Sequence, residues 1–227
     1  MKNLVKNVLF TFGIIAVTQT AFAAGDAAAG AEKVAVCAAC HGADGNSPAP
    51  AFPKIAGLGD KYLLKQLRDI QAWDLETDPA KKPETGRPVP EMTGMLAGMS
   101  DQDLQDIAAH FASQPIQLSG AQELNVRTNA GIDVDALELG ERVYRSGNLA
   151  NGVPACTGCH APDALGNPPA GYPRLSGQYA DYIEKQLLAF RNGTRINDGE
   201  PMVMRLVAEK MSDAEIKAVA NFVAGLH

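Results

Sequence analysis

The chain has 227 residues, of which 46% are hydrophobic and 6% aromatic, and its formal net charge at pH 7 is −6. An acidic chain is a poor nucleic-acid binder, so that class of function is excluded. The charges form no long run of one sign, which indicates a solvated surface. All four cysteines lie in two copies of one pentapeptide, and these copies carry most of the functional information.

Residues 1–23 have the features of a secretory signal peptide. Lys2 and Lys6 give a positive start, residues 8–17 form an apolar run, and Ala-Phe-Ala at 21–23 is a small-x-small cleavage site. The run is about half of the roughly 20 residues that span a bilayer, so cleavage is favoured over a retained membrane anchor. We expect a mature chain that begins at Ala24 and, in a Gram-negative bacterium, is exported to the periplasm.

The first predicted helix, residues 28–36, leads into Cys37-Ala38-Ala39-Cys40-His41. The pattern C-x-x-C-H is the attachment signal for c-type haem, in which both thiols form thioethers and the histidine supplies an axial nitrogen to the iron. A zinc site or a redox dithiol also uses C-x-x-C. A zinc site needs a further pair of ligands and a dithiol has no need of the histidine, so covalent haem is favoured. One metal shared by both motifs is the alternative.

Further elements follow in the first half. The carbonyl of Pro53 is a candidate hydrogen-bond acceptor for the ring of His41, with a simple turn proline as the alternative. Residues 60–72 form a predicted helix with Tyr62, Leu63, Leu67 and Ile70 on one face. Ser100 is the predicted N-cap of the last helix, and Asp103 completes a short form of the capping box.

The second half repeats the first after a linker at 114–133 that is rich in turn-forming residues. A helix at 136–144 precedes Cys156-Thr157-Gly158-Cys159-His160, Pro173 matches Pro53, and a helix at 180–190 matches 60–72. Ser212 and Glu215 form the second capping box. The predicted fold is therefore all-α, with two tandem domains at 24–113 and 134–227, each wrapped around one covalent haem.

Each iron needs a second axial ligand unless that position is left open for chemistry. His110 has no histidine counterpart in the second half and His227 is the last residue, so methionine is the better candidate. Aligning the halves at the last helix gives two methionine pairs, Met92 with Met204 and Met99 with Met211. The second pair directly precedes the N-cap serines, where a side chain packs on its own helix as a hydrophobic staple. We therefore favour Met92 and Met204 as the ligands, with the neighbouring methionines as alternatives.

The chain resembles the dihaem cytochromes c4 over its whole mature length. The resemblance rests on both C-x-x-C-H motifs, the repeated Tyr-x-x-Lys-Gln-Leu helices, the run from Glu91 to Met95, and Asn197-Asp198-Gly199 before Met202-Val203-Met204. It implies two class I cytochrome c domains with His/Met iron, whose methionine ligands fall at Met92 and Met204. It also implies a periplasmic protein, often loosely held at the inner membrane, that passes electrons towards terminal oxidases.

The expected function is one-electron transfer through two covalent haems. Cys37, Cys40, Cys156 and Cys159 are the expected attachment residues, and the expected iron ligands are His41, Met92, His160 and Met204. We expect no catalysis, because filled axial positions exclude substrate, and we expect a monomer that meets a respiratory donor and an oxidase acceptor. The rival hypothesis is a redox enzyme, such as a dihaem peroxidase or a thiosulfate dehydrogenase, or a haem subunit of one. An enzyme needs one open iron and nearby acid–base groups.

Overall fold

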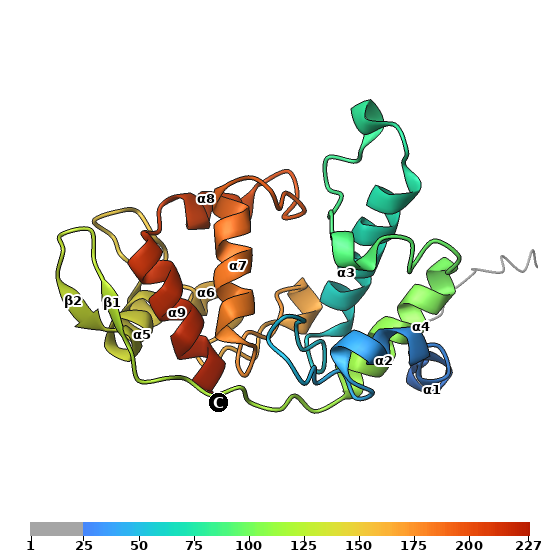
Figure 1. The fold of residues 1–227 in the computed structure, drawn as a ribbon, viewed down its shortest axis with the longest axis horizontal. Coiled ribbons are helices and arrows are strands. Elements are labelled where there is room, and N and C mark those ends of the chain that lie inside the picture. Colours follow the sequence, from blue (N-terminus) through green and yellow to red (C-terminus); the bar gives the residue numbers. More distant parts are fainter. Residues whose placement is uncertain (1–24) are drawn as a thin grey trace, which may run out of the picture.

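The computed structural model describes residues 25–227, so the predicted signal peptide lies outside the described residues. The chain is folded into two helical bodies that lie next to each other (Figure 1). No helix within residues 25–227 is both long enough and apolar enough to cross a bilayer. The elements of the first body are α1 (Ala27–Ala31), α2 (Ala35–His41), α3 (Asp60–Leu75), the 3₁₀ turns η1 (Pro79–Lys81) and η2 (Pro90–Met92), and α4 (Asp101–Ser113).

The second body repeats this arrangement and adds a small hairpin. Its elements are β1 (Asn125–Arg127), β2 (Asp133–Asp135), α5 (Ala136–Ser146), α6 (Thr157–His160), the 3₁₀ turn η3 (Pro168–Ala170), α7 (Ala180–Arg191), α8 (Val203–Glu209) and α9 (Asp213–Gly225). The two strands are antiparallel, with Val126 opposite Val134. The all-α prediction is confirmed for the bulk of the fold, and this hairpin is the part of residues 25–227 that departs from it.

Each body has its own apolar core. In the second body one cluster of buried side chains runs from Val126 to Val223. In the first body two smaller clusters lie along α3, one around Ile107 and Phe111 and the other around Leu96 and Leu104. Within residues 25–227 no buried apolar cluster joins the two halves. The duplication seen in the sequence therefore produces two domains with separate cores.

A glycine lets two helices cross closely in both domains. A Cβ on Gly30 of α1 would lie 2.1 Å from the carbonyl oxygen of Asp106 on α4, and one on Gly140 of α5 would lie 2.2 Å from that of Ala218 on α9. Real Cβ atoms do not approach an oxygen so closely, so only glycine permits these crossings. They fix the helix before each C-x-x-C-H motif against the last helix of the same domain.

Both predicted capping boxes are confirmed, at Ser100 with Asp103 and at Ser212 with Glu215. The prediction for residues 28–36 was wrong in part, because the structure has a turn between α1 and α2 in place of one helix. The turn is closed by the Lys33 N–H, which donates to the carbonyl of Gly30 at 2.9 Å. Lys33 also pairs with Asp103 and Asp106 on α4, so tertiary contacts end α1 early.

The segment between the domains is hydrogen-bonded to both of them. The Gln117 N–H donates to Asn46 of the first domain, and the Ser119 N–H donates to the carbonyl of Gly177 in the second. Direct contacts between the domains are also largely polar. The Gln178 side chain accepts from the Lys54 N–H at 3.0 Å and donates to the Lys54 carbonyl at 2.7 Å. The domains are therefore held in one relative orientation by directed bonds and not by a shared apolar core.

Candidate functional site

The two C-x-x-C-H motifs lie in different domains. The first occupies the last turn of α2, which ends at His41, and the second spans α6, which ends at His160 (Figure 1). Within residues 25–227 no three His, Cys, Asp or Glu side chains are grouped so that they would hold a metal ion. The alternative of one metal shared by both motifs therefore has no ligand cluster to support it.

Both histidine rings are held in the same way. The Nδ1 atom of His41 lies 2.8 Å from the carbonyl oxygen of Pro53, and that of His160 lies 3.0 Å from the carbonyl oxygen of Pro173. A carbonyl only accepts, so Nδ1 must carry the proton and Nε2 keeps its lone pair. The predicted role of the proline carbonyls as ring acceptors is confirmed.

Burial keeps these rings neutral. Desolvation lowers the pKa of both His41 and His160, and the proline hydrogen bonds only partly oppose that effect. An aromatic ring stands edge-on to each histidine, Phe52 beside His41 and Tyr172 beside His160. Each domain thus presents a fixed, neutral imidazole whose free Nε2 has the chemistry of a metal ligand.

The cysteine environment argues against a redox dithiol. Burial raises the pKa of the Cys37 thiol, and it raises that of Cys156 to about 11. Redox-active C-x-x-C pairs do the opposite, since they lower the pKa of the attacking thiol. None of the four cysteines forms a disulfide. The raised pKa values of Cys37 and Cys156 do not fit a redox dithiol.

The two favoured methionines, Met92 and Met204, stand at equivalent positions of the sequence repeat. Met92 ends the turn η2 and packs against the cluster of Ile70, Leu96 and Leu104. Met204 packs against the core of the second domain, but it lies in the short helix α8 and not in a loop as the sequence suggested. Both side chains are half-buried, whereas Met95 and Met202 are each 41% exposed.

The other methionine pair lies in the packing expected of a staple. Met211 is 4% exposed and belongs to the same apolar cluster as Ile216, and Met99 packs with Leu104. Their backbone carbonyls are held by equivalent residues, since Gln71 donates to the carbonyl of Met99 and Arg191 to that of Met211. Met99 and Met211 are therefore fixed structural positions ahead of α4 and α9.

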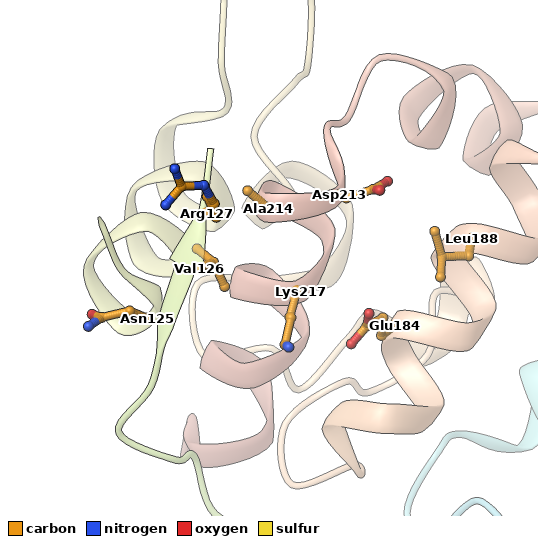
Figure 2. A pocket seen from close by; sticks show the side chains of 8 residues that line it. All are labelled: Asn125, Val126, Arg127, Glu184, Leu188, Asp213, Ala214 and Lys217. Atoms are coloured by element: carbon orange, nitrogen blue, oxygen red, sulfur yellow. The ribbon is translucent and has the colours of Figure 1, made fainter. Parts of the chain in front are cut away.

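The remaining histidines and one surface pocket lie away from the motifs. His110 is half-buried on α4, with Nδ1 at 3.3 Å from the carbonyl of Ala27, and His227 is exposed. The pocket has a volume of about 240 Å³, and Figure 2 shows the side chains from β1, α7 and α9 that line it, including Arg127, Glu184 and Lys217. No cysteine, histidine or methionine lines it, so this cavity belongs to no candidate haem site.

A buried polar cluster between the domains was missed by sequence reasoning. Gln66 on α3 is 7% exposed, and its Oε1 accepts from Arg87 of its own domain and from Arg195 and Asn197 of the other. The repeat offered a signal, because Gln66 recurs as Gln186, which accepts from the same two arginines. A polar residue preserved on an otherwise apolar helix face marks a buried contact.

Comparison with known proteins agrees with this geometry. The family model for cytochrome c matches residues 27–115 and 137–227. Cytochrome c4 of Azotobacter vinelandii is 52% identical, and the match covers 100% of both chains. The crystal structure of reduced recombinant cytochrome c4 from Pseudomonas stutzeri superimposes with a TM-score of 0.80 at 53% identity, covering 90% of this chain and 100% of that one. A thiosulfate dehydrogenase electron acceptor of Thiomonas intermedia is more distant, at 35% identity over 87% of this chain and 81% of its own length.

Proposed function

The chain belongs to the cytochrome c family as a tandem, two-domain member, and from that premise we propose that it is a periplasmic one-electron carrier that delivers electrons to a terminal oxidase. Its two domains bind two covalent haem c groups. When bound, each haem supplies an iron that cycles between the ferrous and ferric states. The residues of the two sites attach each haem and hold its iron.

Cys37 and Cys40 attach the first haem, and Cys156 and Cys159 the second. Their spacing of three places both thiols of a motif on one turn of helix beside the ligating histidine. Attachment takes the thiols out of disulfide chemistry, which suits an oxidising compartment. The predicted signal peptide at 1–23 also supports export.

Nε2 of His41 and His160 and the sulfur atoms of Met92 and Met204 would hold the two irons. The single observation that carries the proposal is that each domain holds a histidine ring on a proline carbonyl and has a half-buried methionine at the equivalent position of the repeat. With both of these residues on its iron, neither domain would leave a place for a substrate. Thioether ligation and burial also raise the reduction potential, which suits delivery to an oxidase.

A redox titration with optical and near-infrared spectra tests this function. We expect two one-electron steps, low-spin iron at both sites throughout, and the weak near-infrared band of thioether-ligated ferric haem from both. A high-spin or five-coordinate iron in either domain would instead favour an enzyme. Sedimentation of the purified protein as a monomer supports a free carrier, whereas co-purification with a dehydrogenase or oxidase supports a docked subunit.

The second candidate is acceptance of electrons from a thiosulfate dehydrogenase. The relative from Thiomonas intermedia is named as an electron acceptor of thiosulfate dehydrogenase. Its match covers 87% of this chain and 81% of that protein. The test is reduction of the purified holoprotein by such a dehydrogenase with thiosulfate, compared with reduction by a quinol-oxidising complex. A much faster reaction with the dehydrogenase would favour this candidate.

A further inference from the structure

The segment that leads into Met204 is fastened to the other domain. Asn197 is 3% exposed, and its Nδ2 donates to Asp69 Oδ2 at 2.7 Å and to Gln66 Oε1 at 2.9 Å, both on α3 of the first domain. Lys65, on the same helix, donates to the Asn197 carbonyl at 2.7 Å. Three contacts from one helix thus hold a single residue of the second domain.

The next residue holds the helix that carries the methionine. Asp198 accepts from the backbone N–H of Arg205 at 2.9 Å and from its Nε at 2.7 Å, and the Asp198 side chain is only 3% exposed. Arg205 directly follows Met204 in α8. Asn197 and Asp198 therefore connect α3 of the first domain to the methionine of the second through two consecutive residues.

Helix α8 depends on this attachment. It has seven residues, too few for a helix that is stable by itself in water. Its N-cap residue, Met202, has φ of 50°, a left-handed conformation that is unfavourable for a residue with a side chain, and it makes no side-chain capping bond. The hydrogen bond from the Arg205 N–H to Asp198 replaces that missing cap.

Another hydrogen bond between the domains lies outside the 195–205 segment. The Tyr179 hydroxyl donates to the carbonyl of Ser47 at 2.6 Å. Tyr179 is the N-cap residue of α7, and this bond joins no residue of the 195–205 segment. The interface therefore offers two separate kinds of contact, one that reaches the methionine helix and one that does not.

We propose that Asp69 and Asn197 are positioning residues for the second iron, so that a residue of the first domain sets how firmly Met204 is held in the second. This inference rests on the proposed ligation by Met204. Neither residue touches the haem in this scheme. They act by fixing the base of the 195–205 segment, which lowers the fraction of time that Met204 is displaced.

The test measures how easily an added ligand replaces Met204. All variants are made in full-length holoprotein that carries Met92→Ala, so that the near-infrared band reports Met204 alone. Imidazole is titrated into the ferric protein, and its apparent dissociation constant is inversely proportional to the open fraction. Loss of one hydrogen bond to a charged group is expected to raise that fraction about tenfold. Asp69→Ala should therefore bind imidazole about tenfold more tightly. Asn197→Ala also removes the bond to Gln66, so its gain in imidazole affinity should be at least as large.

Three controls make the result specific. Tyr179→Phe removes an interdomain hydrogen bond outside the segment and should leave imidazole binding unchanged. Asp69→Asn keeps an acceptor oxygen, so its dissociation constant for imidazole should stay within about threefold of that of the parent protein. The double variant Asp69→Ala with Asn197→Ala should bind imidazole no more tightly than Asn197→Ala alone, because Asn197→Ala already removes the bond to Asp69.

Three results would overturn the inference in different ways. Parental imidazole affinity in both alanine variants, with the band intact, would show that the domain contact does not position Met204 and would leave the ligation standing. A band that survives Met204→Ala would overturn the ligation itself, and this inference with it. A tenfold gain in imidazole affinity in Tyr179→Phe would show that Asp69 acts only through general docking of the two domains. That result would also refute the proposal.

Discussion

Replacing Met204 and Met211 one at a time should distinguish the role of an iron ligand from that of a buried packing residue. Met211 is 4% exposed in the core of the second domain, so Met211→Ala should lower the free energy of unfolding by about 2–5 kcal/mol, the usual range for a buried Met→Ala change. Met204 is half-buried and is the proposed iron ligand. Met204→Ala should therefore act mainly on the spectrum.

The expected spectral loss follows from the duplication. The two domains present the same donor set, so each should contribute half of the near-infrared band of the ferric protein. Met204→Ala should remove that half, and Met92→Ala the other. Met211→Ala and Met99→Ala should leave the band intact while shifting the urea midpoint measured by circular dichroism. Loss of half the band in Met211→Ala, with retention in Met204→Ala, would refute the assignment of ligand and staple.

Three further outcomes are expected. The ferrous protein should bind carbon monoxide poorly at neutral pH, and rapid stoichiometric binding at one haem would instead support an enzyme. Gly140→Ala would place a Cβ 2.2 Å from the Ala218 carbonyl and should lower stability by about 1–3 kcal/mol in urea unfolding, whereas Gly98→Ala, with open space around it, should not. Lys33, together with hydrogen bonds from Asp26 and Gln102, lowers the pKa of Asp106 to about 2. The stability from this ion pair is present above the ordinary carboxyl pKa near 4 and is lost as pH falls towards 2, so the difference in urea midpoint between wild type and Lys33→Met should shrink over that range.

The local elements were predictable because their signals are local. Each C-x-x-C-H motif occupies five consecutive residues, and each capping box, such as Ser212 with Glu215, spans four. The proline acceptors lie 12 and 13 residues after their histidines, within one loop of the repeat. Comparing the two halves also separated the methionine pairs, since the residue before an N-cap has a packing partner on its own helix.

The errors arose where tertiary contacts override local preference. The alanine-rich stretch 28–36 predicts one helix, but the pairing of Lys33 with α4 breaks it into α1 and α2. Met204 was expected in a loop, yet α8 begins one residue before it because Asp198 caps that helix from the preceding turn. The hairpin β1–β2 is too short to leave a period in the sequence.

By itself the sequence determined the cofactor, the number of haem groups and the two-domain plan, because the attachment motifs and the duplication can be read from residue order. Only the tertiary structure decided how the domains meet. Gln66 collects donors from Arg195 and Asn197 at separations of 129 and 131 residues. No local pattern encodes such contacts, since they form only after each domain has folded around its own core and the two polar surfaces have been brought into register.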